Sequence, residues 1–369
     1  MQHANRKLLF HIGHHKTGST SIQNAFATGQ VKLQGGRILY PARLSHNYLR
    51  RNFETYLRDG QILPGTPGFP GLGALSELLG NGDFDVAVIS GESFENARPA
   101  GVRKVLQDFM LPHVTDHAVI CYIRPHAARL LSGYAENLKV GLFSDTLDRF
   151  AEMAMQEVRQ QFAPKLQQWD NVFGRHFLLR PLIRSDLVNG SVLQDFIHTG
   201  FGPNAPVTIG TDQRANESLC IEDLLLVRLV QDQLNSRNRP LQLLMGWELA
   251  SNFAASARTG TGTKLMLHRG LAERIRATYR NDAELLDTRY FGGRALFRAE
   301  LDRSVDEALP EPQSLDPEDY FGADALRALT AMAQQINVLL DHKSGPWPDF
   351  LRQRRIDALH GKTAPDDDT

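Results

Sequence analysis

The chain has 369 residues, of which 42% are hydrophobic, so it is long enough to bury a large core and to form about one to three domains. With 41 Lys and Arg against 42 Asp and Glu, its formal net charge is -1, which argues against a broad basic surface for nucleic acid or an anionic membrane. Its 2 cysteines are too few for a disulfide framework, and no long apolar segment is present, so we expect a cytoplasmic protein without a membrane span.

The first predicted element is a buried strand at residues 8–12, and a helix is predicted shortly after it at residues 20–26. The segment between them combines two glycines, two histidines, a lysine and several hydroxyl side chains: Gly13, His14, His15, Lys16, Thr17, Gly18, Ser19 and Thr20. Glycines let the backbone approach a ligand, and the N–H groups at the start of a helix bind anions. Because Lys16 adds a positive charge, we expect this segment to bind a phosphate or sulfate group.

Two other interpretations of this segment remain open. A Walker A loop requires glycine immediately before the lysine, where this chain has His15, and its first glycine would fall on Phe10. The pattern of nucleoside triphosphatases is therefore broken. The other alternative is a capped turn between a strand and a helix that binds no ligand.

A second strand is predicted at residues 86–89, after a loop at residues 60–73 that is rich in glycine and proline and could cover a substrate. Glu92 follows this strand closely. Because ligands bind at the carboxyl ends of parallel strands, Glu92 is the first candidate for a general base. The alternatives are that Glu92 caps the next helix or pairs with a nearby cation. His14 and His15 are the second candidates for the base, because an imidazole with a pKa of about 6.5 suits proton abstraction.

Arg124 directly follows a third predicted strand at residues 118–123, and Ser132 lies in the helix predicted next, at residues 127–138. An arginine fork and a serine hydroxyl are able to hold one phosphate together. Arg129 lies on the same helix and is a further candidate, with the alternative that it is solvated or paired to an acid. His126, beside Arg124, could instead only shape the turn.

The order of these elements predicts the fold. A less regular strand at residues 177–179 continues the alternation of strands and helices, which implies a parallel sheet covered on both faces. From Glu217 onward the apolar residues recur at helical spacing. We therefore predict an α/β, P-loop-like three-layer core at residues 1–215, a helical extension packed on it at residues 216–358, and a disordered acidic tail at residues 359–369.

The two candidate anion motifs together resemble those of sulfotransferases that use 3′-phosphoadenosine 5′-phosphosulfate (PAPS). The segment from Gly13 to Thr20 resembles the loop that binds the 5′-phosphosulfate in this family, with Ser19 in place of the more usual threonine. The family's 3′-phosphate motif has two arginines, a serine and a tyrosine at spacings that match four residues here: Arg124, Arg129, Ser132 and Tyr134. An acidic residue that often follows the first arginine is absent. A weaker resemblance extends over residues 7 to about 235.

The resemblance implies that the chain transfers a sulfuryl group from PAPS to a hydroxyl or amine of a carbohydrate or small molecule, without a metal. In that interpretation Lys16 stabilises the departing 3′,5′-adenosine diphosphate, and Glu92 takes the proton of the acceptor. A nucleotide-dependent kinase or triphosphatase with an atypical loop, and a nucleotide-binding module without catalysis, remain the alternatives. The sequence does not indicate an oligomeric state.

Overall fold

The computed structural model describes residues 6–13, 17–157, 161–210, 219–234, 239–256 and 261–340. Three of the predicted site residues, His14, His15 and Lys16, lie outside the described residues, as does the predicted tail at 359–369. Contacts between Cα atoms group the chain into two compact units. The first contains residues 1–134, 145–217 and 266–313, and the second contains residues 135–144, 218–265 and 314–369. Residues 266–313, assigned from sequence to the helical extension, thus group with the first unit, while the boundary at 215 stays a prediction.

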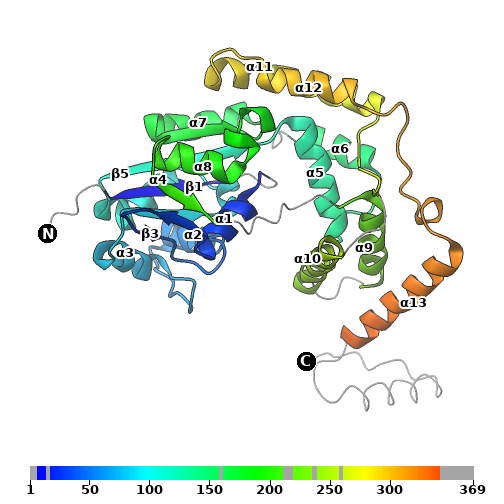
Figure 1. Cartoon of the computed structure of the whole chain (residues 1–369), viewed down its shortest axis with the longest axis horizontal. Coiled ribbons are helices and arrows are strands. Elements are labelled where there is room, and N and C mark those ends of the chain that lie inside the picture. Colours follow the sequence, from blue (N-terminus) through cyan, green and yellow to red (C-terminus); the bar gives the residue numbers. More distant parts are fainter. Residues whose placement is uncertain are drawn as a thin grey trace. The chain divides into compact units, whose positions relative to one another are not determined.

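A five-stranded parallel sheet forms the centre of the first unit (Figure 1), with the strand order β3-β4-β1-β5-β6. The strands are β1 Lys7–His11, β3 Ile38–Leu39, β4 Val86–Ser90, β5 Asp116–Ile123 and β6 Phe177–Pro181. The four predicted strands are confirmed. They could be predicted because parallel strands that are buried on both faces form continuous apolar runs in the sequence. The strands of a separate antiparallel pair, β2 Val31–Leu33 and β7 Val207–Ile209, are too short to stand out in the sequence.

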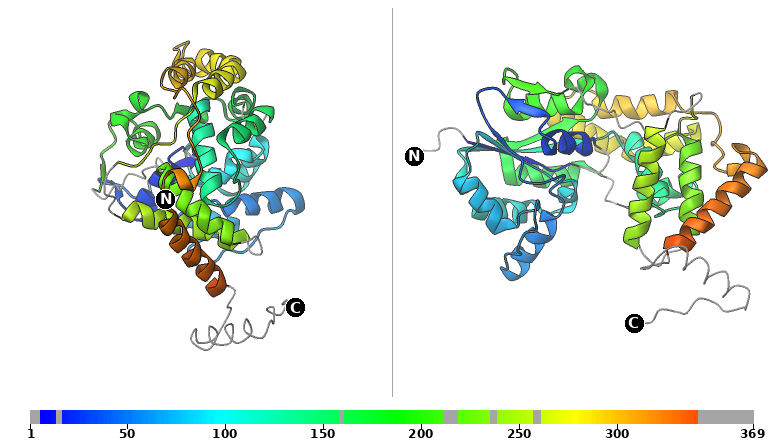
Figure 2. Two further views of the ribbon diagram at one scale, coloured as in Figure 1. Left: turned by 90° about the vertical axis from the view of Figure 1, so that its right-hand side faces the viewer. Right: turned by 60° about the horizontal axis from the view of Figure 1, so that its bottom comes forward.

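Helices cover both faces of this sheet, as Figure 2 shows. On one face Leu9 belongs to a buried cluster with Phe26 of α1 and Phe196 of α8. On the other face Phe10 packs against Phe53 of α2, with the ring centroids 6.2 Å apart. The helices that lie wholly in this unit are α1 Ser19–Ala27, α2 Leu49–Asp59, α3 Leu72–Asn81, α4 Pro99–Phe109, α6 Leu147–Gln156, α7 Ala163–Phe173, α8 Val192–Phe201, α11 Arg269–Tyr290 and α12 Leu296–Asp306. The predicted three-layer α/β core is confirmed.

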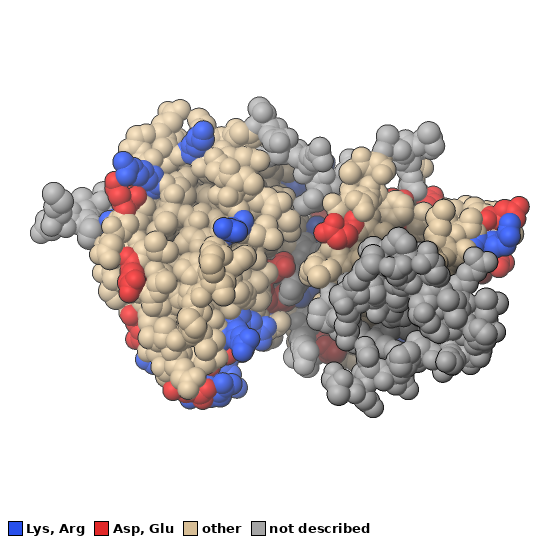
Figure 3. Space-filling model, turned by 90° about the horizontal axis from the view of Figure 1, so that it is seen from below, with Lys and Arg blue, Asp and Glu red and all other residues tan. Residues whose placement is uncertain are grey.

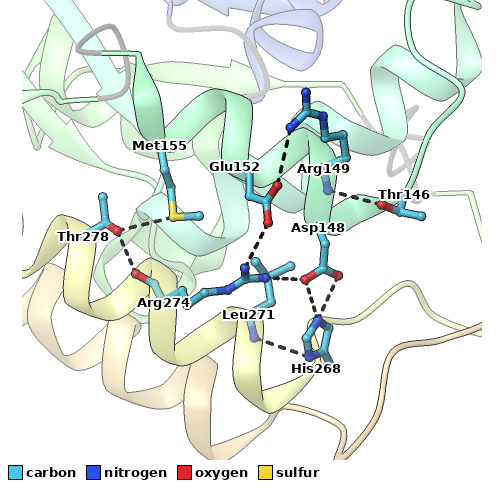
Figure 4. Close-up of polar contacts among 9 residues, drawn as sticks. All are labelled: Thr146, Asp148, Arg149, Glu152, Met155, His268, Leu271, Arg274 and Thr278. Carbon is cyan, nitrogen blue, oxygen red and sulfur yellow. Dashed lines mark hydrogen bonds and ion pairs between the residues drawn. The ribbon is translucent and has the colours of Figure 1, made fainter.

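Polar contacts join α11 to α6 within the first unit (Figure 4). Asp148 on α6 accepts hydrogen bonds from His268 Nε2, at 2.9 and 3.0 Å, and also pairs with Arg274 on α11. Arg274 donates in addition to Glu152, at 3.1 Å. His268 is the N-cap residue of α11, and its Nδ1 accepts from the backbone N–H of Leu271. The contacts of Asp148 and Glu152 with His268 and Arg274 join residues more than a hundred positions apart, and they explain why α11 groups with the first unit.

Two buried carboxylates on α11 cap other helices of the unit. Asp282 accepts hydrogen bonds from the backbone N–H groups of Phe162 and Ala163, both at 2.9 Å, where α7 begins. It also accepts one from His126 Nε2, at 2.8 Å. Asp287 accepts from three backbone N–H groups in the first turn of α12. Since the first N–H groups of a helix have no partner within it, these carboxylates satisfy donors that burial would otherwise leave unpaired.

The second unit is helical. It contains the last residues of α5 His126–Lys139, together with α9 Ile221–Gln233, α10 Arg239–Ala255 and α13 Ala323–Leu340. Gln231 on α9 is buried, and its side-chain amide donates to the backbone oxygens of Lys139 and Gln242, at 3.0 and 2.8 Å. One side chain thereby ties together three helices of this unit. The predicted helical C-terminal region is confirmed.

The surface of the described residues carries both signs of charge. In the view of Figure 3, Lys and Arg side chains lie among Asp and Glu side chains and do not gather into one basic area. None of the helices within the described ranges is long and apolar enough to cross a membrane. The cytoplasmic location and the absence of a nucleic-acid partner stay predictions.

Candidate anion-binding site

The loops that follow β1, β4 and β5 leave the sheet at the same edge. His11, the last residue of β1, lies opposite Ser90 of β4 and Ile120 of β5 in the strand register. Beyond these positions the backbone pairing continues, because Gly91 N donates to His11 O at 3.0 Å and Ile12 N donates to Ile120 O at 2.9 Å. In a parallel sheet whose strand order reverses at β1, this carboxyl edge is where ligands bind.

Gly18 starts helix α1 in a conformation that favours glycine. Its φ is 79°, in the left-handed region, and a Cβ atom there would lie 2.9 Å from Val192 Cγ1. The backbone oxygen of Gly18 accepts from Ser21 N at 3.1 Å, which closes the first turn of α1. The helix thus begins directly after the loop, and its first N–H groups lie at the edge where an anion would bind.

Gly13 and Ser19 meet at the base of the loop. A Cβ atom on Gly13 would lie only 2.1 Å from Ser19 Oγ, so only glycine leaves room for this hydroxyl. Ser19 Oγ is buried and has no hydrogen-bond partner. Thr17 is also buried, whereas Thr20 is exposed. A buried hydroxyl without a partner costs stability. We therefore expect a ligand oxygen to supply the missing hydrogen-bond partner of Ser19.

Glu92 is the second residue after β4 and the first of a short 3-10 turn, η1 Glu92–Asn96. Its side chain is half-buried. The adjacent Ser93 is held by Asn47, whose Oδ1 accepts from Ser93 N at 3.0 Å and whose backbone oxygen accepts from Ser93 Oγ at 3.1 Å. The turn that carries Glu92 is therefore fixed at the same edge as the loop after β1. No local pattern indicates Asn47, because it lies 46 residues from Ser93 in the sequence.

Arg124 directly follows β5, which runs three residues beyond the position paired with the end of β1. Its side chain is half-buried, and it forms neither a hydrogen bond nor an ion pair with any residue that the structure describes. Burial lowers the pKa of this guanidinium, and no neighbouring carboxylate offsets the effect. A partly desolvated cation without a counter-charge is a binding group for an anion. Ser132, on the following helix α5, is also half-buried, and no hydrogen bond joins it to Arg124.

Arg129 differs from Arg124, because it already has an acidic partner. Its Nη2 donates to Glu95 Oε1 at 2.5 Å, and its guanidinium carbon lies 5.0 Å from the ring centroid of Phe162. Glu95 is almost fully buried and also lies 3.6 Å from Lys165 Nζ. The structure therefore shows the alternative stated for Arg129, a pairing with an acid, since the guanidinium neutralises a buried carboxylate. Its predicted role in nucleotide binding stays a prediction.

His126 contributes to the packing around helix α11 and does not lie at the carboxyl edge of the sheet. Its imidazole is buried, donates to Asp282 and stacks on Tyr279, with ring centroids 4.8 Å apart. Burial lowers its pKa, although the hydrogen bond to Asp282 acts in the opposite direction. This partner lies 156 residues away, so the sequence could not indicate it.

The residues at this edge fit a small anion. Within the residues that the structure describes, Ser19 Oγ lacks a partner and no carboxylate lies beside Arg124. Among the described residues, no group of three or more His, Cys, Asp or Glu side chains is placed to hold a metal ion. The glycine- and proline-rich loop forms an open pocket of about 420 Å³ of its own, lined by residues that include Pro41, Pro67 and Leu78.

Comparisons with known proteins add little to this geometry. No protein-family model matches the chain, and no curated protein matches it. Among solved structures, the crystal structure of a sulfotransferase from Alicyclobacillus acidocaldarius is similar, with 14% sequence identity and a TM-score of 0.38. The match covers 78% of this chain and 96% of that chain. At this TM-score we draw no conclusion from the likeness, and the function is argued from the site.

Proposed function

We propose that the chain is a sulfotransferase that takes a sulfuryl group from PAPS and transfers it to a hydroxyl or amine of a carbohydrate or small molecule. One observation supports the proposal: two polar groups that have no partner among the described residues lie at one edge of the sheet. They are the buried hydroxyl of Ser19 in the loop after β1 and the half-buried guanidinium of Arg124 after β5. A nucleotide with separate 5′ and 3′ anionic groups would engage both.

The residues divide between the two anionic ends of this nucleotide. The loop from Gly13 to Thr20, including Lys16, would hold the 5′-phosphosulfate through backbone N–H groups, hydroxyls and one positive charge. Arg124 and Ser132 would hold the 3′-phosphate. The order of these motifs along the chain is the one that resembles the PAPS-dependent family.

PAPS supplies a sulfuryl group whose bond to the 5′-phosphate oxygen breaks as a new S–O or S–N bond to the acceptor forms. The electron pair of the broken bond stays on the departing phosphate oxygen, where Lys16 would neutralise the growing charge. Glu92, held at the end of β4, would accept the proton of the acceptor. Ser19 and Arg124 would fix the nucleotide so that the three atoms in the transfer lie in line.

The test is transfer of labelled sulfate from PAPS to a panel of sugars, alcohols and amines. Glu92→Gln removes the proposed base while keeping the shape of the side chain, and its rate constant for transfer should fall about 100-fold or more. Lys16→Ala should reduce transfer by a similar factor. Glu77→Gln, an exposed glutamate on α3, is the matched control and should keep full activity.

The outcomes separate the candidate functions. Binding of 3′,5′-adenosine diphosphate with no transfer to any acceptor, together with an inert Glu92→Gln substitution, would favour a nucleotide-binding module. Magnesium-dependent hydrolysis of ATP would favour a triphosphatase. Full transfer activity in Glu92→Gln would show that another group is the base, with His14 and His15 next in line.

A further inference from the structure

A chain of buried polar groups lies beneath the loop after β1. Ser90 Oγ, at the end of β4, is 2.8 Å from His11 Nδ1 and accepts a hydrogen bond from Gln23 Nε2 at 3.3 Å. All three side chains are almost fully buried. The other ring nitrogen, His11 Nε2, has no hydrogen-bond partner in the part of the chain that the structure describes. The proposed function leaves this imidazole without a role.

The hydrogen bonds around Ser90 are compatible with a proton on His11 Nε2. Gln23 donates to Ser90 Oγ, and the serine hydroxyl can donate its own hydrogen to His11 Nδ1. In this tautomer the imidazole hydrogen lies on Nε2, which makes this atom a donor. A buried N–H without an acceptor costs about 1–3 kcal/mol, so a partner for it in the working protein is expected.

The imidazole lies beside the base of the anion loop. The position of a Cβ atom on Gly13 is 3.3 Å from His11 Cε1, the carbon between Nδ1 and Nε2, and 2.1 Å from Ser19 Oγ. The His11 ring on the strand and the Ser19 hydroxyl on the helix therefore both lie beside Gly13, and each has a buried polar atom without a partner among the described residues. The rings of Tyr122 and Phe196 close the other sides of the imidazole.

His11 is held in its uncharged form. Burial lowers its pKa to about 3, so the ring stays neutral at ordinary pH. It can therefore donate a hydrogen bond without adding a full positive charge to the site. In a site closed to water, a neutral donor of fixed orientation still stabilises an anion strongly.

We propose that His11 is a further ligand-binding residue of this site: its Nε2–H, together with the Ser19 hydroxyl, binds one oxygen of a tetrahedral anion at the carboxyl edge of the sheet, beside Gly13. The proposal rests on the proposed function for the identity of the nucleotide, but it also applies to other anions of the same shape. It requires only a fully ionised sulfuryl or phosphoryl group at the base of the loop.

Two substitutions separate the two nitrogens of the ring. In His11→Asn the side-chain amide reaches the position of Nδ1, so the contact with Ser90 can be kept while the donor at Nε2 is lost. In His11→Gln the amide reaches the position of Nε2. We expect His11→Asn to weaken binding of 3′,5′-adenosine diphosphate, measured by calorimetry, about 10- to 100-fold, and His11→Gln to recover part of that loss.

His46 provides a matched control. It is equally buried, its pKa is also lowered to about 3, and its Nδ1 accepts a hydrogen bond from Ser90 N at 3.1 Å. Its Nε2 also lacks a partner, but its ring packs against Tyr40 and Tyr48. We expect His46→Asn to lower stability as much as His11→Asn and to change the nucleotide affinity less than about 2-fold.

A spectroscopic measurement shows whether His11 contacts the ligand or only stabilises the fold. In protein labelled with ¹⁵N histidine, the Nε2 resonance that disappears in His11→Asn should move when nucleotide or inorganic sulfate binds. An unmoved resonance, or equal affinity losses in His11→Asn and His46→Asn, would overturn the proposal. If sulfate shifts the resonance but 3′,5′-adenosine diphosphate does not bind, the role of His11 stands and the proposed function fails. If neither ligand binds the unmodified protein, both fail.

Discussion

The carboxyl edge of the sheet and the buried carboxylates of helix α11 differ in how their polar groups are satisfied. On α11, Asp282 and Asp287 each accept at least three hydrogen bonds. At the edge, His11 Nε2 and Ser19 Oγ have no partner among the described residues, and no described carboxylate lies beside Arg124. Two buried atoms near these carboxylates are also unpartnered among the described residues, His126 Nδ1 and the Tyr290 hydroxyl. Folded proteins rarely leave buried polar groups unpaired, so the contrast marks α11 as structural support and the edge as a binding site.

The largest expected effect is on the stability of the packing around the buried carboxylates of α11. Asp282→Ala removes the acceptor for His126 and for two backbone N–H groups at the start of α7. We expect the free energy of unfolding, measured with urea, to fall by about 3–5 kcal/mol. Asp302→Ala is the control, because its contacts with Arg276 and Arg280 are exposed ion pairs worth less than about 1 kcal/mol. If the two variants lost the same free energy of unfolding, the buried carboxylate of Asp282 would stabilise the fold no more than an exposed ion pair.

The two arginines of the segment after β5 should respond in opposite ways. Arg129→Met leaves Glu95 buried with fewer donors, and we expect it to lower the free energy of unfolding by about 3 kcal/mol. Arg124→Met removes a cation that has no partner, so stability should stay within about 0.5 kcal/mol or rise. Its affinity for 3′,5′-adenosine diphosphate should fall about 100-fold.

The comparison of the arginines fails in either of two ways. If Arg124→Met binds nucleotide as tightly as the unmodified protein, Arg124 is not an anion-binding group. If Arg129→Met keeps its stability but loses affinity, Arg129 belongs to the site and not to the support. Urea unfolding and calorimetry on the same two preparations give both readouts.

The neutral histidines at the edge predict a loss of stability in mild acid. Burial lowers the pKa values of His11 and His46 to about 3, so between pH 6.5 and 3 the unfolded chain binds protons that the folded chain does not. Their contribution is complete above pH 6.5 and declines as the pH falls. Each should lose about 2 kcal/mol between pH 7 and pH 5. His46→Gln should therefore show a smaller loss over this interval in urea unfolding, and an unchanged pH dependence would mean that the pKa of His46 is the same in the folded and unfolded chains.

The smallest expected effect concerns Ser19. Ser19→Ala removes a buried hydroxyl that has no partner among the described residues, so stability should stay the same or rise. Nucleotide affinity should fall about 10-fold, because one hydrogen bond to an anion is lost. A stability loss in Ser19→Ala without a change in affinity would place this hydroxyl in the support.

The sequence predicted the parts of the fold that depend on local pattern. The strands that end at His11, Ser90 and Ile123 are apolar runs, and Pro99 at the start of α4 is a helix-start residue. It missed β3, which has two residues and is held mainly by its pairing with β4.

The site was predicted less completely, because some of its distinctions depend on distant partners. Arg124 and Arg129 have the same side chain, and only the fold shows that Glu95 lies beside one of them. His126 is sequentially next to the site but is bound by Asp282 of α11. His11 was treated as part of a strand, since nothing local shows that its ring faces Ser90 and the space beside Gly13.

The most direct test of the account compares two nucleotides by thermal unfolding. At about a hundred times its dissociation constant, a ligand adds about 2.7 kcal/mol to the stability of the folded state. We predict that 3′,5′-adenosine diphosphate without magnesium raises the melting temperature, and that ATP with magnesium raises it much less. A rise with ATP and magnesium alone would contradict the assignment of this edge as a PAPS site.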